Sequence, residues 1–297
     1  MPDRTTLAYI GATLLFWSSA FAGIRSALIG LSPGHLLLLR FGIASVVLLA
    51  WTRAIRLPWP PVRLWGRLAV IGVVGISVYQ GCLTFGEQVV PAGTASFIVA
   101  TAPVFTALLA AWWLGERISR RARLGLGVSL AGVGLISFGT GSAAFHQSAL
   151  LIVVSAAATA VFFVAQKPLL AHYPPLAVTA WVTWAGTLPL LVFAPGLAAN
   201  VVTAPPASLW SVAYLGVLPA AVAYALWAHA LQRRPAGQVS SWLYLNPFLA
   251  TVIGWAWLGE VPAWTALAGG VVAIAGVVLV NGRPARALAP ARPNSNA

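Results

Sequence analysis

Charged side chains are scarce in this sequence. Only 7% of the 297 residues are charged and only four of them are acidic, whereas a soluble domain carries about 25% charged residues. Because 60% of the residues are hydrophobic, the chain has too little polar surface to cover itself against water. These proportions exclude a soluble enzyme, a nucleic-acid-binding domain and a disordered protein.

Cysteine is nearly absent as well, since Cys82 is the single one in the sequence. This excludes a disulfide framework and a multi-cysteine metal site. The sequence has no phosphate loop of the Walker A type and no His-Glu-x-x-His motif, so we expect neither ATP nor a metal or other cofactor. With four acidic residues, it also offers little material for an intramembrane enzyme.

Long apolar runs fill the rest of the chain. A bilayer crossing needs about 20 mostly apolar residues, and ten such runs are separated by charges or by proline and glycine. We therefore expect an all-α integral membrane protein with ten transmembrane helices, which we number as spans 1 to 10. They cover residues 6–24, 34–52, 68–88, 93–114, 124–141, 148–171, 176–195, 210–231, 236–258 and 264–281.

The basic residues predict how the spans are oriented. With the N-terminus inside, every Lys and Arg except Arg25 and Arg40 falls on the inner side. Cytoplasmic loops carry such an excess of basic residues. We therefore expect both termini in the cytoplasm, in a bacterial inner membrane, and a disordered cytoplasmic tail at 283–297.

The chain also contains an internal repeat. Residues 92–136 align without gaps with residues 236–280 at an offset of 144, with fifteen of 45 positions identical, and the earliest spans align at an offset of 142. We call residues so aligned repeat mates. Each half, 1–143 and 144–282, then holds five spans, and an odd number places the halves in opposite orientations. Inverted repeats are typical of secondary transporters, in which a site between the halves opens alternately to each side.

Three motifs carry a resemblance to a known family. They are Phe16-Trp17-Ser18-Ser19-Ala20-Phe21, then Pro33 with Arg40-Phe41, and Trp-Leu-Gly-Glu at 113–116 and again at 257–260. With them the chain resembles the EamA-type drug/metabolite transporters. The resemblance implies ten helices, a cavity lined mainly by spans 1, 3, 4, 6, 8 and 9, and export of amino acids or similar small metabolites. Relatives of this kind also move drugs, nucleotide sugars and sugar phosphates, which remain alternatives.

Polar side chains within spans indicate where a cavity would lie, because hydrocarbon offers them no partner. In span 3, Gln80, Thr84 and Glu87 share one helical face with Ser77, and Tyr224 is the repeat mate of Gln80. In span 1, Trp17 lies at mid-membrane; the repeat mates of its face include Thr159, Phe162 and Gln166. We expect substrate contacts from Trp17, Gln80, Thr84, Thr159, Phe162, Gln166 and Tyr224. Hydrogen bonds or packing between helices are the alternative.

Spans 4 and 9 each carry a central proline, Pro103 and Pro247. A proline removes a backbone donor, so each could act as a hinge, with a static kink as the alternative. Ser240 and Tyr244 share a face with Pro247 and are expected to line the cavity. The buried polar Asn246 is expected to brace the helices.

Charged groups near the span ends suggest pairing or gating. Arg40 and Glu87 would form an ion pair, since an unpaired charge there is costly; alternatively, Arg40 binds a cargo carboxylate. Arg25 and its repeat mate Lys167 would form equivalent gates at the two ends, with snorkelling as the alternative. Glu116 and Glu260 are expected to cap or pair with loops.

Small residues recur in spans 5 and 10 at Gly125 and Ser129 and at Gly269 and Ala273. This spacing permits close helix approach, either inside the chain or across a homodimer. The sequence thus predicts a carrier for a small molecule in the lipid bilayer, with no nucleic-acid partner. A channel or a membrane scaffold is the rival reading.

Overall fold

The computed structural model describes residues 3–90, 92–139, 147–259 and 264–281. All elements in this part of the chain are helical. The α-helices are α1 (Arg4–Ala27), α2 (Pro33–Ala54), α3 (Trp65–Gly72), α4 (Tyr79–Gly86), α5 (Ala92–Val99), α6 (Ala102–Leu114), α7 (Arg120–Gly139), α8 (Gln147–Leu170), α9 (Pro175–Thr187), α10 (Leu197–Thr203), α11 (Pro206–Leu215), α12 (Ala223–Arg233), α13 (Ala236–Ser240), α14 (Asn246–Leu258) and α15 (Trp264–Asn281). Five short segments of other helical type join them: η1 (Val62–Leu64), η2 (Val73–Val78), η3 (Leu188–Phe193), η4 (Gly216–Val222) and η5 (Ser241–Leu245).

Seven helical segments of the described chain are long and apolar enough to cross a membrane. They are Arg4–Ala27, Pro33–Ala54, Val62–Gly86, Ala95–Leu114, Ser148–Leu170, Pro175–Phe193 and Pro206–Arg233. The protein is therefore a multi-pass, all-helical membrane protein. The predicted spans 5, 9 and 10 coincide with α7, with α13 to α14 and with α15, which are not among the seven, so the number ten stays a prediction. The tail at 283–297, the boundary at 143 and Glu260 lie outside the described residues.

The same backbone features recur at the repeat offset. The π-helical η2 and η4 lie at matching positions, and α6 and α14 begin and end 144 residues apart. Both α6 and α14 end in a left-handed glycine, Gly115 at φ 67° and Gly259 at φ 71°, a common helix C-cap. These matches support the predicted relation of the two halves.

Spans 4 and 9 are broken at their prolines. The first half has α5 and α6 separated at Ala100 and Thr101, with Pro103 in the first turn of α6. In the second half the 3₁₀ segment η5 separates α13 from α14, and Pro247 lies in the first turn of α14. Proline fits the first turn because the missing N–H would be unpaired there anyway. The predicted bends are therefore present as helix breaks, and their use as hinges remains a prediction.

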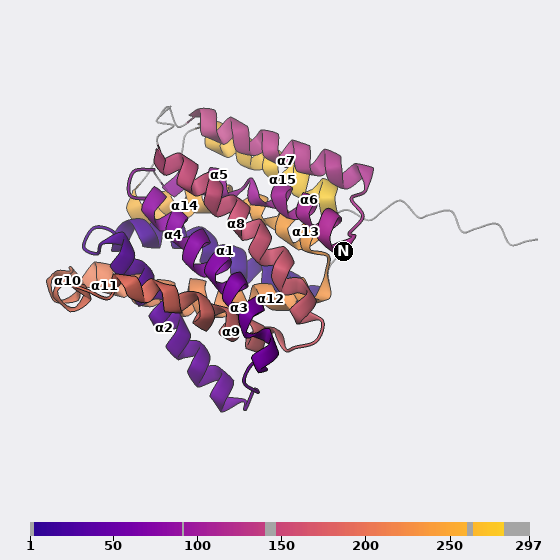
Figure 1. Cartoon of the computed structure of the whole chain (residues 1–297). Coiled ribbons are helices and arrows are strands. Elements are labelled where there is room, and N and C mark those ends of the chain that lie inside the picture. Colours follow the sequence, from indigo (N-terminus) through magenta and orange to yellow (C-terminus); the bar gives the residue numbers. More distant parts are fainter. Residues whose placement is uncertain (1–2, 91, 140–146, 260–263, 282–297) are drawn as a thin grey trace, which may run out of the picture.

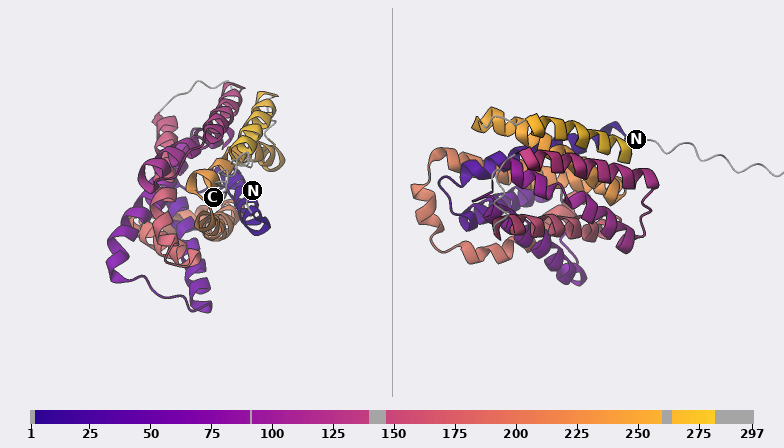
Figure 2. Two further views of the ribbon diagram at one scale, coloured as in Figure 1. Left: turned by 90° about the vertical axis from the view of Figure 1, so that its right-hand side faces the viewer. Right: turned by 90° about the horizontal axis from the view of Figure 1, so that it is seen from above.

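The last helices of the two halves, α7 and α15, run side by side along one edge of the bundle (Figures 1 and 2). A Cβ on Gly125 would lie 2.8 Å from the carbonyl oxygen of Gly276, and Ser129 also contacts Gly276. Close approach of this kind is what small residues permit between membrane helices. Gly125 and Ser129 thus serve packing inside the chain, and a homodimer through these spans remains an untested prediction.

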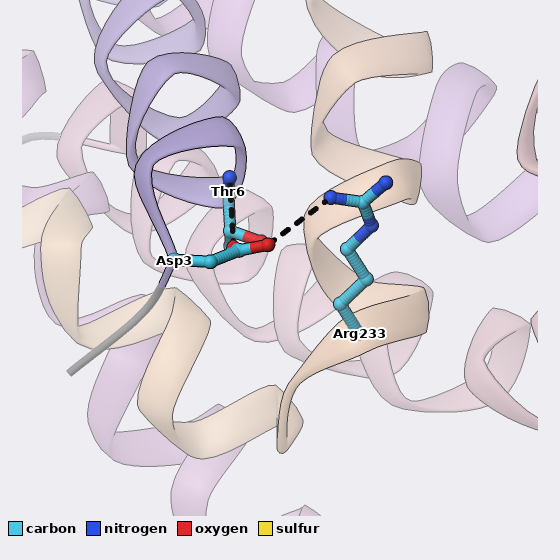
Figure 3. Close-up of polar contacts among 3 residues, drawn as sticks. All are labelled: Asp3, Thr6 and Arg233. Atoms are coloured by element: carbon cyan, nitrogen blue, oxygen red, sulfur yellow. Dashed lines mark hydrogen bonds and ion pairs between the residues drawn. The ribbon is translucent and has the colours of Figure 1, made fainter.

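The N-terminus is anchored at one end of the bundle, opposite the end that carries α10 (Figure 1). Asp3 caps α1 by accepting a hydrogen bond of 3.0 Å from the backbone N–H of Thr6, and its other oxygen lies 3.5 Å from Arg233 of α12 (Figure 3). The hydrogen bonds with Thr6, helped by Arg233, hold the pKa of Asp3 below its ordinary value. We call this end the N-terminal end and the other the α10 end.

Candidate functional site

A central cavity lies where the first and second halves meet. Residues of α1, α2, α4, α5, α8, η5 and α14 line it. Its volume is about 30 Å³, which holds water but not a metabolite. Spans 1, 3, 4, 6 and 9 contribute as predicted. Span 2, which was not among the expected spans, contributes Arg40. Span 8 was expected, but none of its residues borders the cavity.

Repeat mates face one another across this cavity. Trp17 and Thr159 both line it, and so do the mates Val99 and Leu243. Such pairs are expected when a site lies on the axis relating two inverted halves. Of the predicted substrate contacts, Trp17, Gln80 and Thr159 line the cavity directly.

A chain of hydrogen bonds crosses the cavity wall. The buried Arg40 donates from Nη1 to Gln80 Oε1 at 2.9 Å, and Gln80 Nε2 donates to the hydroxyl of Tyr224 at 2.7 Å. Arg40 Nε has no partner, and the side chain borders the cavity. A guanidinium with an unused N–H at a cavity is suited to bind a carboxylate.

Aromatic rings form another part of the wall. Trp17 stacks nearly parallel to Phe163, with ring centroids 6.0 Å apart, and meets Tyr224 edge-on at 5.4 Å. Its indole N–H donates to the carbonyl of Pro219 in η4 at 3.1 Å. Because both its ring and its N–H are fixed, Trp17 gives the cavity a rigid apolar face next to the polar chain from Arg40 to Tyr224.

The predicted ion pair between Arg40 and Glu87 is wrong for this structure. Asp3 and Arg233 form the single ion pair recorded among the described residues, and Arg40 binds Gln80 instead. Glu87 is fully buried, and neither carboxylate oxygen has a hydrogen-bond partner. The sequence places Arg40 in span 2 and Glu87 in span 3 at similar depths in the membrane. Depth alone does not determine the direction in which the Arg40 side chain extends.

Several predicted contacts lie behind the cavity wall. Thr84 and Gln166 are buried without bordering it, Phe162 packs on Phe163 and Tyr224, and the Ser240 hydroxyl bonds the carbonyl of Gly237. Tyr244 lies in a separate small cluster with Phe97 and Ala100, and its hydroxyl has no partner. For Phe162, Ser240 and Tyr244, the structure shows helix packing or local hydrogen bonding and no cavity lining.

Other lining residues were not predicted. Phe21 and Phe163 are repeat mates that both border the cavity, and Tyr79 lies beside Gln80 there. Asn246 borders it as well and accepts a hydrogen bond from Ser18 at 3.1 Å, the bracing role expected for it. The internal repeat could have identified Phe21 and Phe163, because the repeat mate of a residue that lines the cavity is itself a candidate for lining it.

Arg25 and Lys167 make equivalent contacts at opposite ends. Arg25 Nη1 donates to the backbone carbonyl of Glu87 at 3.2 Å, and Lys167 Nζ donates to the carbonyl of Leu231 at 2.7 Å and to that of Arg234. Leu231 is the repeat mate of Glu87. Each cation therefore binds the C-terminal carbonyls of the matching helix, α4 or α12, where positive charge is favourable. In this structure, such a contact is therefore present at both the α10 end and the N-terminal end.

Glu116 has the capping role expected for it. Its two carboxylate oxygens accept hydrogen bonds from the backbone N–H groups of Ala236 and Gly237 at 2.8 and 3.2 Å, which neutralises the N-terminus of α13. The described residues contain no cluster of three or more His, Cys, Asp or Glu side chains that could hold a metal ion.

Comparisons with known proteins agree with this architecture. A probable terminal-alkyne amino-acid exporter of Streptantibioticus cattleyicolor is 41% identical over 271 residues, covering 91% of each chain. The uncharacterized transporter YdfC of Bacillus subtilis is 35% identical over 280 residues, covering 93% of this chain and 92% of its own. A crystal structure superposes with a TM-score of 0.73 at 21% identity, covering 95% and 97% of the two chains, which shows the same fold.

The sequence profile of the EamA-like transporter family matches two segments, residues 5–138 and 146–282. Together they include nearly all the described helices and every residue that lines the central cavity. The resemblance found in the Trp-Leu-Gly-Glu and Phe-Trp-Ser motifs is thereby confirmed, and the chain belongs to the EamA-like transporter family.

Proposed function

We propose that this protein is a secondary transporter that exports amino acids or similar small metabolites by alternating access through the central cavity. The observation that carries the proposal is the cavity itself. It lies between the halves and joins one buried cation, Arg40, to neutral polar groups and an aromatic wall. A small molecule with a carboxylate at one end and an apolar part at the other matches that arrangement.

A single buried arginine also limits the cargo. A nucleotide sugar or sugar phosphate carries several negative charges and requires several cations, whereas Arg40 is the one Lys or Arg among the described residues that borders the central cavity. The exporter name of the Streptantibioticus relative, which specifies an amino acid with a terminal alkyne, supports the same class of cargo.

The size of the cavity supports a mechanism that requires movement. With a volume of about 30 Å³, it must enlarge before a metabolite fits, so the halves have to separate. The contacts of Arg25 and Lys167 with the ends of α4 and α12 are the bonds that such separation would break. In this proposal, opening one end while the other stays tied moves cargo across the inner membrane, with both termini in the cytoplasm.

The test is a flux assay in proteoliposomes. Proteoliposomes that contain the purified protein are loaded with an unlabelled amino acid and placed in the same amino acid in radiolabelled form. The amino acids are L-leucine, L-phenylalanine and L-propargylglycine, which carries a terminal alkyne. The proposal predicts saturable counterflow of at least one of them and its loss in Trp17→Ala, with unchanged membrane insertion. Conductance that does not saturate would identify a channel, and full transport by Trp17→Ala would remove the proposed site.

A further inference from the structure

A second hollow lies on the outside of the bundle, where α8 of the second half packs against helices of the first half. It is a groove of about 500 Å³ between α3, α6 and α8, which we call the lateral groove. Its walls are apolar: Val70 and Val74 on one side, Val161 on the other and the indole of Trp113 at the rim. Val70 and Trp113 are more than half exposed, so the groove faces the surroundings of the protein, which at this depth are hydrocarbon.

One end of the lateral groove carries a cation. Arg67 lines it near the start of α3, and its Nη2 donates to the carbonyl of Ala165 on α8 at 3.3 Å. That bond fixes the guanidinium across the groove while using one of its five N–H donors. The groove therefore combines a slot for hydrocarbon with a charged group held at its mouth.

At the equivalent position of the repeat, between α11, α14 and α1, the described side chains contact one another directly. The repeat mate of Val70 is Tyr214, whose hydroxyl is hydrogen-bonded to Ser19, the mate of Val161. The Tyr214 ring packs edge-on against Trp257, the mate of Trp113, with ring centroids 5.8 Å apart. A tyrosine with a paired hydroxyl thus occupies at this position the space that Val70 and Val161 leave open at the lateral groove.

We propose that the lateral groove binds one acyl chain of an anionic phospholipid, with the lipid phosphate on Arg67. The apolar walls fit an acyl chain, the arginine fits a phosphate in a bidentate manner, and a basic residue near the membrane surface attracts anionic lipid. The bound chain lies against α8, the helix whose Thr159 and Phe163 line the central cavity from its other face. The proposal requires the membrane location of the protein and does not rest on the proposed transport.

The repeat supplies the test variant. Val70→Tyr with Val161→Ser copies Tyr214 and Ser19, the hydrogen-bonded pair at the equivalent position of the repeat. Each protein is reconstituted in nanodiscs of equal phosphatidylglycerol and phosphatidylcholine, and retained lipids are counted by native mass spectrometry. The wild type is expected to retain phosphatidylglycerol, and the double variant to lose it. Arg67→Gln is expected to lower the preference for phosphatidylglycerol about fivefold, since one basic residue contributes about 1 kcal/mol.

A reverse variant controls for effects of substitution outside the lateral groove. Tyr214→Val opens the equivalent position of the repeat and leaves the lateral groove intact, so its retention of phosphatidylglycerol should not fall. Equal retention by the wild type and Arg67→Gln would overturn the assignment of the phosphate. Unchanged retention in the folded double variant would overturn the groove as the binding site.

Discussion

The two halves of this protein share a backbone plan and differ in side chains. Both contain a π-helical segment, a helix broken at proline and a left-handed glycine after it. Yet Arg40 has Val182 as its repeat mate, and the open position at Val70 corresponds to the filled one at Tyr214. We propose that the shared backbone allows two exchangeable states, and that the unequal side chains determine what is bound and from which side.

The largest effect should come from removing the buried cation that only the first half has. Arg40→Gln deletes the charge proposed to bind cargo and leaves Gln80 without its donor. We expect transport of an amino-acid substrate to fall about 100-fold, because losing a buried charge-assisted bond costs roughly 2–5 kcal/mol. Initial rates in proteoliposomes measure this. Val182→Ala is the matched control in the second half, and an equal loss there would contradict the asymmetry.

Close packing, by contrast, should be equally sensitive in both halves. A Cβ on Gly72 would lie 2.6 Å from the backbone N of Gly186, and one on its mate Gly216 would lie 2.7 Å from Ile43 Cβ. Gly72→Ala and Gly216→Ala should each destabilise the protein by about 1–3 kcal/mol through overpacking. Thermal unfolding in detergent measures this against Gly81→Ala, because nothing lies within 4 Å of a Cβ there. An unchanged melting temperature of Gly72→Ala would show that α3, which contains Gly72, and α9, which contains Gly186, separate readily.

Intermediate effects are expected at the two end contacts. Lys167→Met removes the bonds to the end of α12, and Arg25→Met removes the bond to the end of α4. We expect the first to favour opening at the N-terminal end and the second at the α10 end, each about 5–10-fold. Accessibility of single cysteines on either side, in a Cys82→Ala background, reports the shift. Shifts in the same direction would show that these contacts are not equivalent.

The smallest effect should come from Asp3, which is exposed and forms the ion pair with Arg233 (Figure 3). Its pKa is lower in the folded state than its ordinary 3.8. Its stabilisation is therefore present above pH 3.8 and is lost as the pH falls through the lower, folded value. Asp3→Asn should lower the melting temperature slightly at pH 7 and leave it unchanged well below pH 3.8. An equal difference at both pH values would exclude the carboxylate as the cause.

Much of the fold could be predicted from the sequence, because a helix that crosses the hydrocarbon of a bilayer needs about 20 mostly apolar residues. The predicted span 34–52 lies within α2 (Pro33–Ala54), and 148–171 nearly matches α8 (Gln147–Leu170). The short α10 was missed, since seven residues do not make an apolar run. The π segments η2 and η4 were missed too, because tertiary packing and not local propensity selects them.

The candidate site was predictable in part. Mid-span polar and aromatic residues led to Trp17, Gln80 and Thr159, which border the central cavity. Their contact with substrate stays a prediction. Tyr244 and Phe162 were expected to line the cavity and do not border it. Tyr244 lies in the 3₁₀ segment η5 and packs with Phe97 and Ala100, and on α8 it is Phe163 that borders the cavity. The partner of Arg40 could not be found from depth alone, since its long side chain reaches Gln80 instead of Glu87.

In the proposed transport the two ends open alternately around one cavity, and distances measured at each end test this. Spin labels at 29 and 88 report on the α10 end, and labels at their repeat mates 171 and 232 report on the N-terminal end. Pulsed electron resonance in nanodiscs is measured in Cys82→Ala, with Arg25→Met or Lys167→Met to bias the states. We predict that Arg25→Met lengthens the 29–88 distance and that Lys167→Met lengthens the 171–232 distance, never both together. Distances that lengthen at both ends at once, or that no variant changes, would contradict it.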